Sequence, residues 1–244
     1  MIVDDVSYLA EPFFQDGIIA QAVDQVHSQG VSYFSSAGNY GDNSYQAAFR
    51  PSGEELFIDS LSVGVMHDFD ERPDSVNTRQ SMTIPANTSV LFGFQWVDNY
   101  SSLNAGLGAQ TDLDIYFAME SPIEYSIDWT DIFQDPVNVF SLSTGDEAVD
   151  LDVIITNYEG DDPSMLKYII FSTAPTINSF DTQSSTSFGH ANASGANGVG
   201  AVFYGYTPAY GINAPILESF SSKGGTPIYL DQQGNFLTQP ITRE

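Results

Sequence analysis

Residues 15–41 of the chain read QDGIIAQAVDQVHSQGVSYFSSAGNYG, and this stretch decides the expected fold. Gly30 stands where a helix C-cap belongs, and residues 31–34 are a short apolar run typical of a buried strand. The run leads into a corner of small polar residues, 36–39. The preceding segment predicts a helix, because its apolar side chains recur at the spacing of one helix face: Ile19, Ala22, Val23 and Val26.

The pattern changes near residue 50, where helix signals stop and short strand signals separated by turns begin. Strands are expected at residues 89–97, 111–119, 137–142, 149–156 and 166–172. We therefore predict an α/β core with a parallel sheet, interrupted by an all-β sandwich that has its own core. The predicted domains are residues 1–49 and 188–244 for the two core segments and residues 50–187 for the insert. In the second segment we expect a strand at residues 198–203 and a hairpin at residues 228–237.

Charge and composition exclude several classes of function. The chain has 32 acidic and 6 basic residues, a formal net charge of -26, so it would be repelled by nucleic acids and anionic membranes. It has no cysteine, which excludes disulfides, cysteine zinc sites and a thiol nucleophile. No apolar run is long enough to predict a membrane span. An acidic surface suits a secreted protein in salty water, and the uncapped apolar start at Ile2 suggests an internal part of a longer chain.

Four short stretches carry a resemblance to a known family. They are VDDVSY at residues 3–8, GVSYFSSAGN at residues 30–39, GVGAV at residues 198–202 and FSSKG at residues 220–224. In order and spacing they resemble the subtilisin-like serine peptidases, or subtilases, over residues 1–49 and 188–244. The resemblance implies a partial subtilisin-like α/β core and a polypeptide substrate.

The same resemblance implies roles for particular residues. Asn39 would donate its side-chain amide to the oxyanion of the tetrahedral intermediate. Ser7, Tyr8 and Leu9 would form an edge strand that pairs with the substrate backbone and walls the specificity pocket, and Ala37 and Gly38 would form its floor. The alternatives are an Asn that only tolerates the turn after Gly38 and an ordinary edge strand. Tyr8 and Leu9 stand where the family usually has glycines, so the pocket is expected to differ in size.

The family's catalytic motifs are missing from the sequence. Neither an Asp-Thr/Ser-Gly, a His-Gly-Thr nor a Gly-Thr-Ser-x-Ala motif occurs. Asp4 and Asp5 align with the strand that leads to Ser7, and the histidines at 27, 67 and 190 stand at the wrong places for the base. We therefore expect an inactive fragment that carries the oxyanion donor but no catalytic triad.

The insert offers weaker candidates. Residues 94–96 and 112–116 resemble the jelly-roll-like sandwich domains found beside secreted bacterial peptidases. Asp112 and Asp114 alternate along one strand and could bind calcium, or they could form a solvated face. Three aromatic residues could bind glycans or peptides, or pack in the core: Trp96, Tyr100 and Trp129.

Three functional hypotheses follow. The leading one is a fragment of a secreted subtilisin-like serine endopeptidase that requires no cofactor. The second is a non-catalytic binding or cell-surface module on a degenerate peptidase core, whose sandwich binds calcium, peptide or glycan. The third is an insert that shields or widens the cleft. Because an incomplete parallel sheet exposes edges and apolar faces, the fragment is also expected to self-associate.

Overall fold

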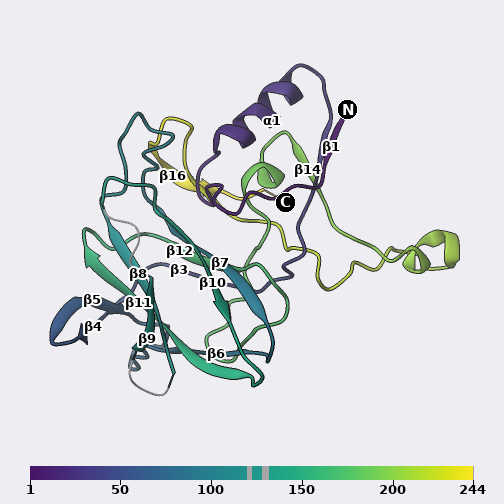
Figure 1. Ribbon diagram of the computed structural model, residues 1–244. Coiled ribbons are helices and arrows are strands. Elements are labelled where there is room, and N and C mark those ends of the chain that lie inside the picture. The colour runs from purple at the N-terminus through teal and green to yellow at the C-terminus, as the bar shows by residue number, and fades with distance from the viewer. Residues whose placement is uncertain (120–122, 128–131, 244) are drawn as a thin grey trace.

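The computed structural model describes residues 1–119, 123–127 and 132–243, without the side chains of residues 123–127. Two regions can be distinguished in the ribbon (Figure 1). Residues 44–177, here called the two-sheet region, hold eleven of the sixteen strands of the described chain. Residues 1–43 and 178–243, here called the corner region, hold the only α-helix of the described chain and a small parallel sheet.

The two-sheet region consists of antiparallel strands. The first sheet has the order β10-β7-β12-β3, and the second has the order β13-β6-β11-β5-β4, with β8 also paired to β11 and β9 paired to β8. The strands of the first sheet are β3 Ser44–Ala47, β7 Ser89–Trp96, β10 Val137–Ser143 and β12 Leu166–Ile170. Those of the second are β4 Pro51–Ile58, β5 Leu61–His67, β6 Gln80–Ile84, β8 Asp112–Ala118, β9 Ile123–Ile127, β11 Val149–Glu159 and β13 Thr176–Ile177.

One apolar cluster fills the space between these sheets. In β7 the side chains of Val90, Phe92 and Phe94 are buried in this cluster, while Leu91 between them is exposed. The period of two is that of a strand with one face on a core. From the second sheet, Phe117 and Ile155 join the same cluster. Since both sheets contribute to one core, the region stabilises itself by apolar burial.

The corner region is built around three short parallel strands. β2 Tyr33–Ser36 lies between β1 Ile2–Asp4 and β14 Ala196–Val199. The helix α1 Ile18–Ser28 packs its buried residues Ala20 and Val23 against Ala193. The other elements are η1 Gly189–Asn192, η2 Tyr204–Tyr206, η3 Pro208–Tyr210, β15 Ile228–Leu230 and β16 Phe236–Ile241.

The end of α1 matches the sequence prediction. Gly30 has φ +83°, its N–H donates to the His27 carbonyl, and the Val31 N–H donates to the Val26 carbonyl. These two bonds are a Schellman motif, which favours glycine because the left-handed conformation has no Cβ penalty. The helix face differs from the prediction, since Ala22 is exposed and Ala20 is buried in its place. None of the helices in the described part of the chain combines the length and apolar character that a membrane crossing requires.

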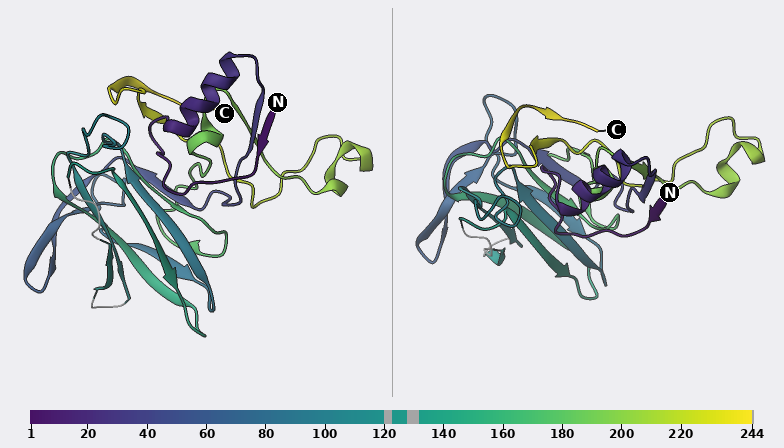
Figure 2. Two further views of the ribbon diagram at one scale, coloured as in Figure 1. Left: turned by 45° about the horizontal axis from the view of Figure 1, so that its top comes forward. Right: turned by 90° about the horizontal axis from the view of Figure 1, so that it is seen from above.

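Buried amides join the two regions. The Gln95 side chain on β7 accepts from the Phe13 N–H at 2.8 Å and donates to the Glu11 carbonyl at 2.9 Å. Beside it, Phe13 and Phe14 pack with Ile169 of β12 in a second apolar cluster. Figure 2 shows the segment after the N-terminal strand, in purple, running toward the strands of the two-sheet region. Residues 11–14 are therefore fixed by the neighbouring sheet although they form no strand of their own.

The predicted α/β fold class is wrong for this chain. The structure is 38% strand and 9% helix, and its sheets are mainly antiparallel, so a parallel-sheet subtilisin core is not present as predicted. Among the described residues, strands pair in parallel only in β1–β2 and β2–β14. The strong helix and strand signals of residues 15–41 belong to one 11-residue helix and one four-residue strand. These elements are too few to set the class, which the more numerous short antiparallel strands determine.

Candidate functional site

The corner at residues 36–39 lies at the carboxyl end of β2. Gly38 has φ +98°, and a Cβ built on it would lie 2.7 Å from the Ser222 Oγ. Glycine is therefore required both by the backbone conformation and by the close approach of a second segment. Asn39 follows directly and is exposed.

Three segments far apart in the sequence meet at this corner. The Ala37 N–H donates to the Val199 carbonyl at 3.0 Å, and the Ser222 N–H donates to the Gly38 carbonyl at 2.9 Å. The Ser222 Oγ in turn accepts from the Tyr40 N–H at 3.1 Å. The corner, the strand β14 and the turn at residues 220–224 thus form one hydrogen-bonded unit. Because both neighbours of Asn39 are fixed in this way, the backbone that carries its side chain is well supported.

Asn39 lines an open cleft of about 400 Å³. The cleft lies at the carboxyl ends of the parallel strands, where α/β proteins commonly bind ligands. Its polar walls include Asp4 and Ser35, and Gly200 contributes backbone from the segment after β14. The arrangement presents a neutral amide donor at the mouth of a cavity large enough for part of a peptide.

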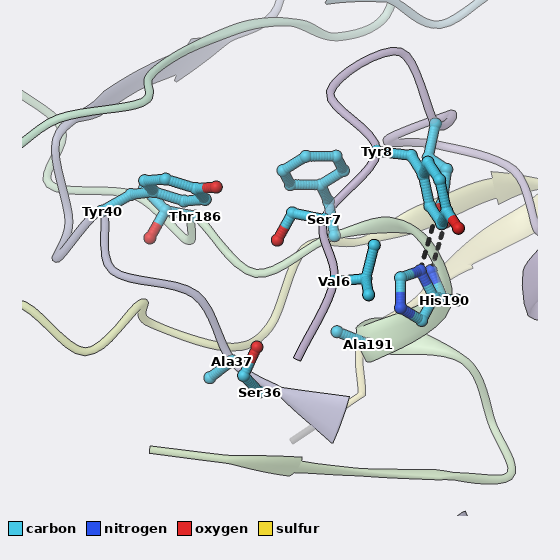
Figure 3. A pocket seen from close by; sticks show the side chains of 11 residues that line it. Val6, Ser7, Tyr8, Ser36, Ala37, Tyr40, Thr186, His190 and Ala191 are labelled. Atoms are coloured by element: carbon cyan, nitrogen blue, oxygen red, sulfur yellow. Dashed lines mark hydrogen bonds and ion pairs between the residues drawn. The ribbon is translucent and has the colours of Figure 1, made fainter. Parts of the chain in front are cut away.

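Ser7 and Tyr8 line a separate, smaller pocket with Ala37 (Figure 3). β1 ends at Asp4, so Ser7 lies in a loop and Leu9 in a turn, and the predicted edge strand is shorter than expected. The pocket has a volume of about 10 Å³. The structure therefore brings Ser7, Tyr8 and Ala37 together, whereas Gly38 lines the Asn39 cleft and Leu9 lines neither cavity.

A buried histidine between two carboxylates forms one side of this pocket. His190 Nδ1 lies 2.6 Å from Glu11 Oε1, and its Nε2 lies 3.5 Å from Asp4 Oδ1. The hydrogen bond with Glu11 raises the pKa of His190, and the negative charges of Glu11 and Asp4 act in the same direction. The charged imidazolium is therefore favoured. Both ring nitrogens face carboxylates, so His190 is not oriented as the base of a serine nucleophile.

Asp4 is held by the strand beside it. It accepts from the Ser35 Oγ at 2.6 Å and from the Tyr33 hydroxyl. Burial acts to raise the pKa of Asp4, but these two hydrogen bonds and the charge of His190 outweigh it, so the pKa lies below its usual value. Asp4 consequently stays ionised beside His190. Sequence spacing does not reveal this cluster, because Glu11 and His190 are 179 positions apart.

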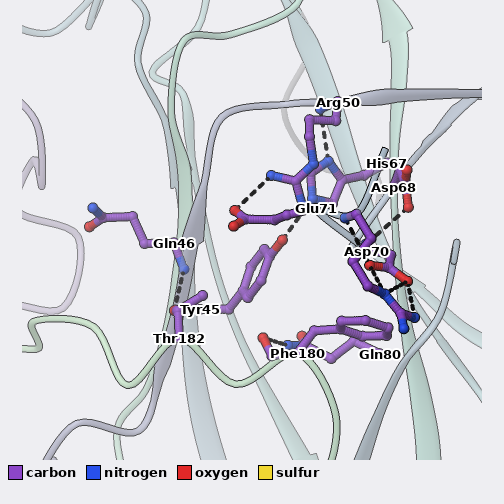
Figure 4. A network of polar contacts seen from close by, with 11 residues as sticks. Tyr45, Gln46, Arg50, His67, Asp68, Asp70, Glu71, Gln80, Phe180 and Thr182 are labelled. Atoms are coloured by element: carbon purple, nitrogen blue, oxygen red, sulfur yellow. Dashed lines mark hydrogen bonds and ion pairs between the residues drawn. The ribbon is translucent and has the colours of Figure 1, made fainter. Parts of the chain in front are cut away.

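The other two histidines lie outside the candidate site. His27 is exposed on the last turn of α1. His67 is buried in the two-sheet region, where its Nδ1 accepts from the Arg50 N–H at 3.1 Å and its Nε2 lies 2.8 Å from the Tyr45 hydroxyl (Figure 4). Burial, assisted by the Arg50 charge, lowers the pKa of His67 to about 3. The ring is neutral, and since Nδ1 accepts, Nε2 donates to Tyr45.

The predicted candidates of the insert are mostly buried. Asp112 and Asp114 are both buried, and Asp114 accepts from the Tyr116 hydroxyl at 3.0 Å, so they do not form a solvated face. Within the described residues, no group of three or more His, Asp or Glu side chains is arranged to hold a metal. Calcium binding stays a prediction. Trp96 and Tyr100 are buried, with the Trp96 Nε1–H donating to the Thr111 carbonyl, and Trp129 lies outside the described residues.

A buried lysine was not anticipated from the sequence. Lys167 on β12 is fully buried, and its Nζ lies within 3.0–3.3 Å of three neutral groups: Gln46 Oε1, Ser184 Oγ and Ser185 Oγ. Burial, together with the charge of Lys223, lowers the pKa of Lys167 to about 7. Lys167 is on β12 of the first sheet, whereas Ser184 and Ser185 belong to the corner region. The Lys167 ammonium group therefore lies at the junction of the two regions.

Comparison with known proteins gives limited information. No family model matches the chain. No curated protein matches its sequence. Among solved structures, the chain is similar to the CspB protease of Clostridium perfringens, with 10% identity over 91% of this chain and a TM-score of 0.40. The chain spans 44% of the length of that protease, so the comparison is a distant likeness to part of a protease structure.

Proposed function

We propose that the chain supplies the oxyanion donor and one wall of the substrate cleft of a secreted subtilisin-like serine endopeptidase. One observation carries the proposal. Asn39 is exposed at a cleft of about 400 Å³, on a corner that main-chain bonds tie to Val199 and Ser222. These contacts join three of the four stretches that carry the sequence resemblance.

The chemistry of Asn39 suits this role. Its side-chain amide is a neutral, directional donor that does not titrate, and such a donor stabilises the negative oxygen that develops when a carbonyl is attacked. His190 is committed to Glu11 and Asp4 and does not serve as the general base. In this proposal the nucleophile and its base come from polypeptide outside residues 1–244, and the chain alone does not hydrolyse peptides.

The test is peptide hydrolysis by the complete reading frame that contains this chain. The Asn39→Ala variant is expected to lose about 10²–10³ in kcat with little change in KM, because the donor acts on the transition state. Asn197→Ala is the matched control, since Asn197 is also exposed and lies on the adjacent strand β14. Equal kcat for wild type and Asn39→Ala, or a reading frame without a Gly-Thr-Ser segment, would contradict the proposal.

A second candidate function is a binding module in the two-sheet region. A cavity of about 530 Å³ opens between the ends of its strands, a size typical of ligand sites. Its wall combines apolar side chains such as Leu142 with the hydroxyls of Ser141, Ser143 and Thr144. Titration calorimetry with peptides and glycans would test it, with Leu142→Trp to fill the cavity and Leu107→Trp, at an exposed site, as control. Binding that both variants retain would contradict this assignment.

A further inference from the structure

We propose that the pocket between Ser7, Tyr8 and Ala37 accepts only a small substrate side chain, that of Gly, Ala or Ser. The inference rests on the proposed function. In that function, this pocket lies beside the oxyanion corner and receives the side chain of the substrate residue on the acyl side of the cleaved bond. It assigns the substrate class of that site: extended peptides with a small residue at this position.

The size of the pocket is the first argument. Its volume of about 10 Å³ equals the space for about one water molecule, and a methyl group fills a similar space. Four aromatic rings line it and take up the remaining room: Tyr8, Tyr40, Phe188 and His190. Figure 3 shows Tyr8 and His190 side by side at one wall and Tyr40 at the opposite side. A Leu or Phe side chain therefore has no space unless a ring moves.

The second argument is that the His190 side of the pocket is fixed. Glu11 binds both the Nδ1 and the backbone N–H of His190, and the Glu11 carbonyl is itself held by Gln95. Gly189 has φ +60°, and a Cβ there would lie 2.2 Å from the Glu11 carboxylate. Glu11 thus holds both the ring and the backbone of His190. Moving the ring would separate a buried charge from its partner.

Phe188 forms a second wall of the pocket, and its position is also fixed by its neighbours. Its ring centroid lies 4.7 Å from that of Phe13 and 5.7 Å from that of Phe171, within the apolar cluster that joins the two regions. Displacing Phe188 would open this cluster. Two walls of the pocket therefore cannot yield to a larger substrate side chain at low cost.

Tyr8 is the one ring whose removal leaves the core intact. It is 52% exposed, and its ring centroid lies 5.9 Å from that of His190. Truncating Tyr8 removes its ring contact with His190 but takes no side chain out of the apolar clusters, so it enlarges the pocket from the solvent side. Tyr8 is therefore the residue that sets the size limit, and it stands where the subtilase pattern has glycine.

The experiment measures peptide binding to the 244-residue chain by fluorescence anisotropy. The probes are labelled extended peptides that are identical except for one residue, which is Gly, Ala, Leu or Phe. Wild type is expected to bind the Ala peptide at least about tenfold more tightly than the Phe peptide, and Tyr8→Ala to reduce this ratio to about twofold. Tyr158→Ala is the matched control, because Tyr158 is 57% exposed in the two-sheet region.

The outcomes separate the inference from the proposed function. Equal binding of the Ala and Phe peptides by wild type, or an unchanged ratio in Tyr8→Ala with a native circular dichroism spectrum, overturns the size limit and leaves the peptide cleft in place. No binding of any of the four peptides overturns the peptide cleft itself, and the size limit with it. A ratio that falls in Tyr8→Ala and not in Tyr158→Ala supports both.

Discussion

The two-sheet region and the corner region are stabilised in different ways. Phe92, Phe94 and Phe117 are completely or almost completely buried between two sheets, whereas Val3 and Val199 on the outer strands of the parallel sheet are exposed. The corner region has smaller apolar clusters and adds polar contacts between distant segments, such as Glu11 with His190 and Asp16 with Arg243. The difference shows that one region is stabilised mainly by one large apolar core, while the other combines small apolar clusters with directional polar bonds around the candidate site.

The largest expected effect comes from the apolar core. Phe92→Ala removes a fully buried ring and should lower the free energy of unfolding by about 3–5 kcal/mol. Leu91→Ala on the same strand should change it by less than about 0.5 kcal/mol, because Leu91 is exposed. Urea unfolding measures both. Similar losses for the two variants would show that the buried and exposed faces of β7 are assigned wrongly.

The next effect breaks the polar cluster of the corner region. Glu11→Ala leaves His190 buried beside Asp4 alone and should cost about 3 kcal/mol, since removing one partner of a buried pair leaves a poorly compensated charge. Glu159→Ala, at an exposed carboxylate, should cost almost nothing. Thermal unfolding of the two variants provides the comparison, and equal melting temperatures would contradict it.

The same cluster gives a pH dependence. Because the folded-state pKa of His190 is raised, its stabilisation is fully present below the unfolded value of 6.5 and is lost as the pH rises through the raised pKa. Relative to Glu11→Gln, the wild type should therefore lose stability as the pH rises above 6.5. Urea unfolding between pH 5.5 and 9 measures this difference, and parallel curves for the two proteins would exclude it.

Lys167 should show the opposite slope at the junction. Its folded-state pKa of about 7 lies below the unfolded value of 10.5, so the unfolded chain binds more protons between these values and stability rises with pH there. Lys167→Met should stabilise the protein by about 1 kcal/mol at pH 6, and the gain should shrink toward pH 10. Denaturation at both pH values decides this, and a gain that is the same at both would contradict it.

The smallest effect on stability is expected in the aromatic segment that projects from the corner region, residues 203–217 (Figure 1). Tyr204 and Tyr210 are 65% and 62% exposed and pack on each other. Replacing both with Ser should change stability by less than about 0.5 kcal/mol. If exposed apolar surface drives the proposed self-association, the double variant should have a lower mass by light scattering than wild type, with Tyr158→Ser as control. An unchanged mass would show that Tyr204 and Tyr210 do not drive self-association.

Strands with strong apolar alternation could be predicted from the sequence. All five strands expected between residues 89 and 172 are present as β7, β8, β10, β11 and β12, with ends within a few residues. The strands β4 and β5 are not predicted from the sequence, because the turn of their hairpin lacks the usual Asn-Gly. Asp59 and Ser60 form this turn, and both have positive φ. Since several such strands gave weak signals, the α/β signal of residues 15–41 dominated the predicted class.

The candidate site could be predicted only where it is local in sequence. The corner at Gly38 and Asn39 is a short motif, and its glycine has a steric reason visible in the structure. The cluster of Glu11, His190 and Asp4 arises from chain folding over long separations, so no spacing rule could reveal it. The burial of Lys167 could not be predicted either, because a lysine in a strand is ordinarily expected at the surface.

The bridging amide of Gln95 has a consequence for limited proteolysis. By binding the Phe13 N–H and the Glu11 carbonyl, it keeps residues 11–14 as firmly attached as a strand of the sheet would be. Residues 5–8, only a few positions earlier, are exposed and outside regular structure. An added protease should therefore cut before Glu11 and stop there, leaving a trimmed chain whose first residues are held by the Gln95 amide, by the packing of Phe13 and Phe14 and by the Glu11–His190 contact.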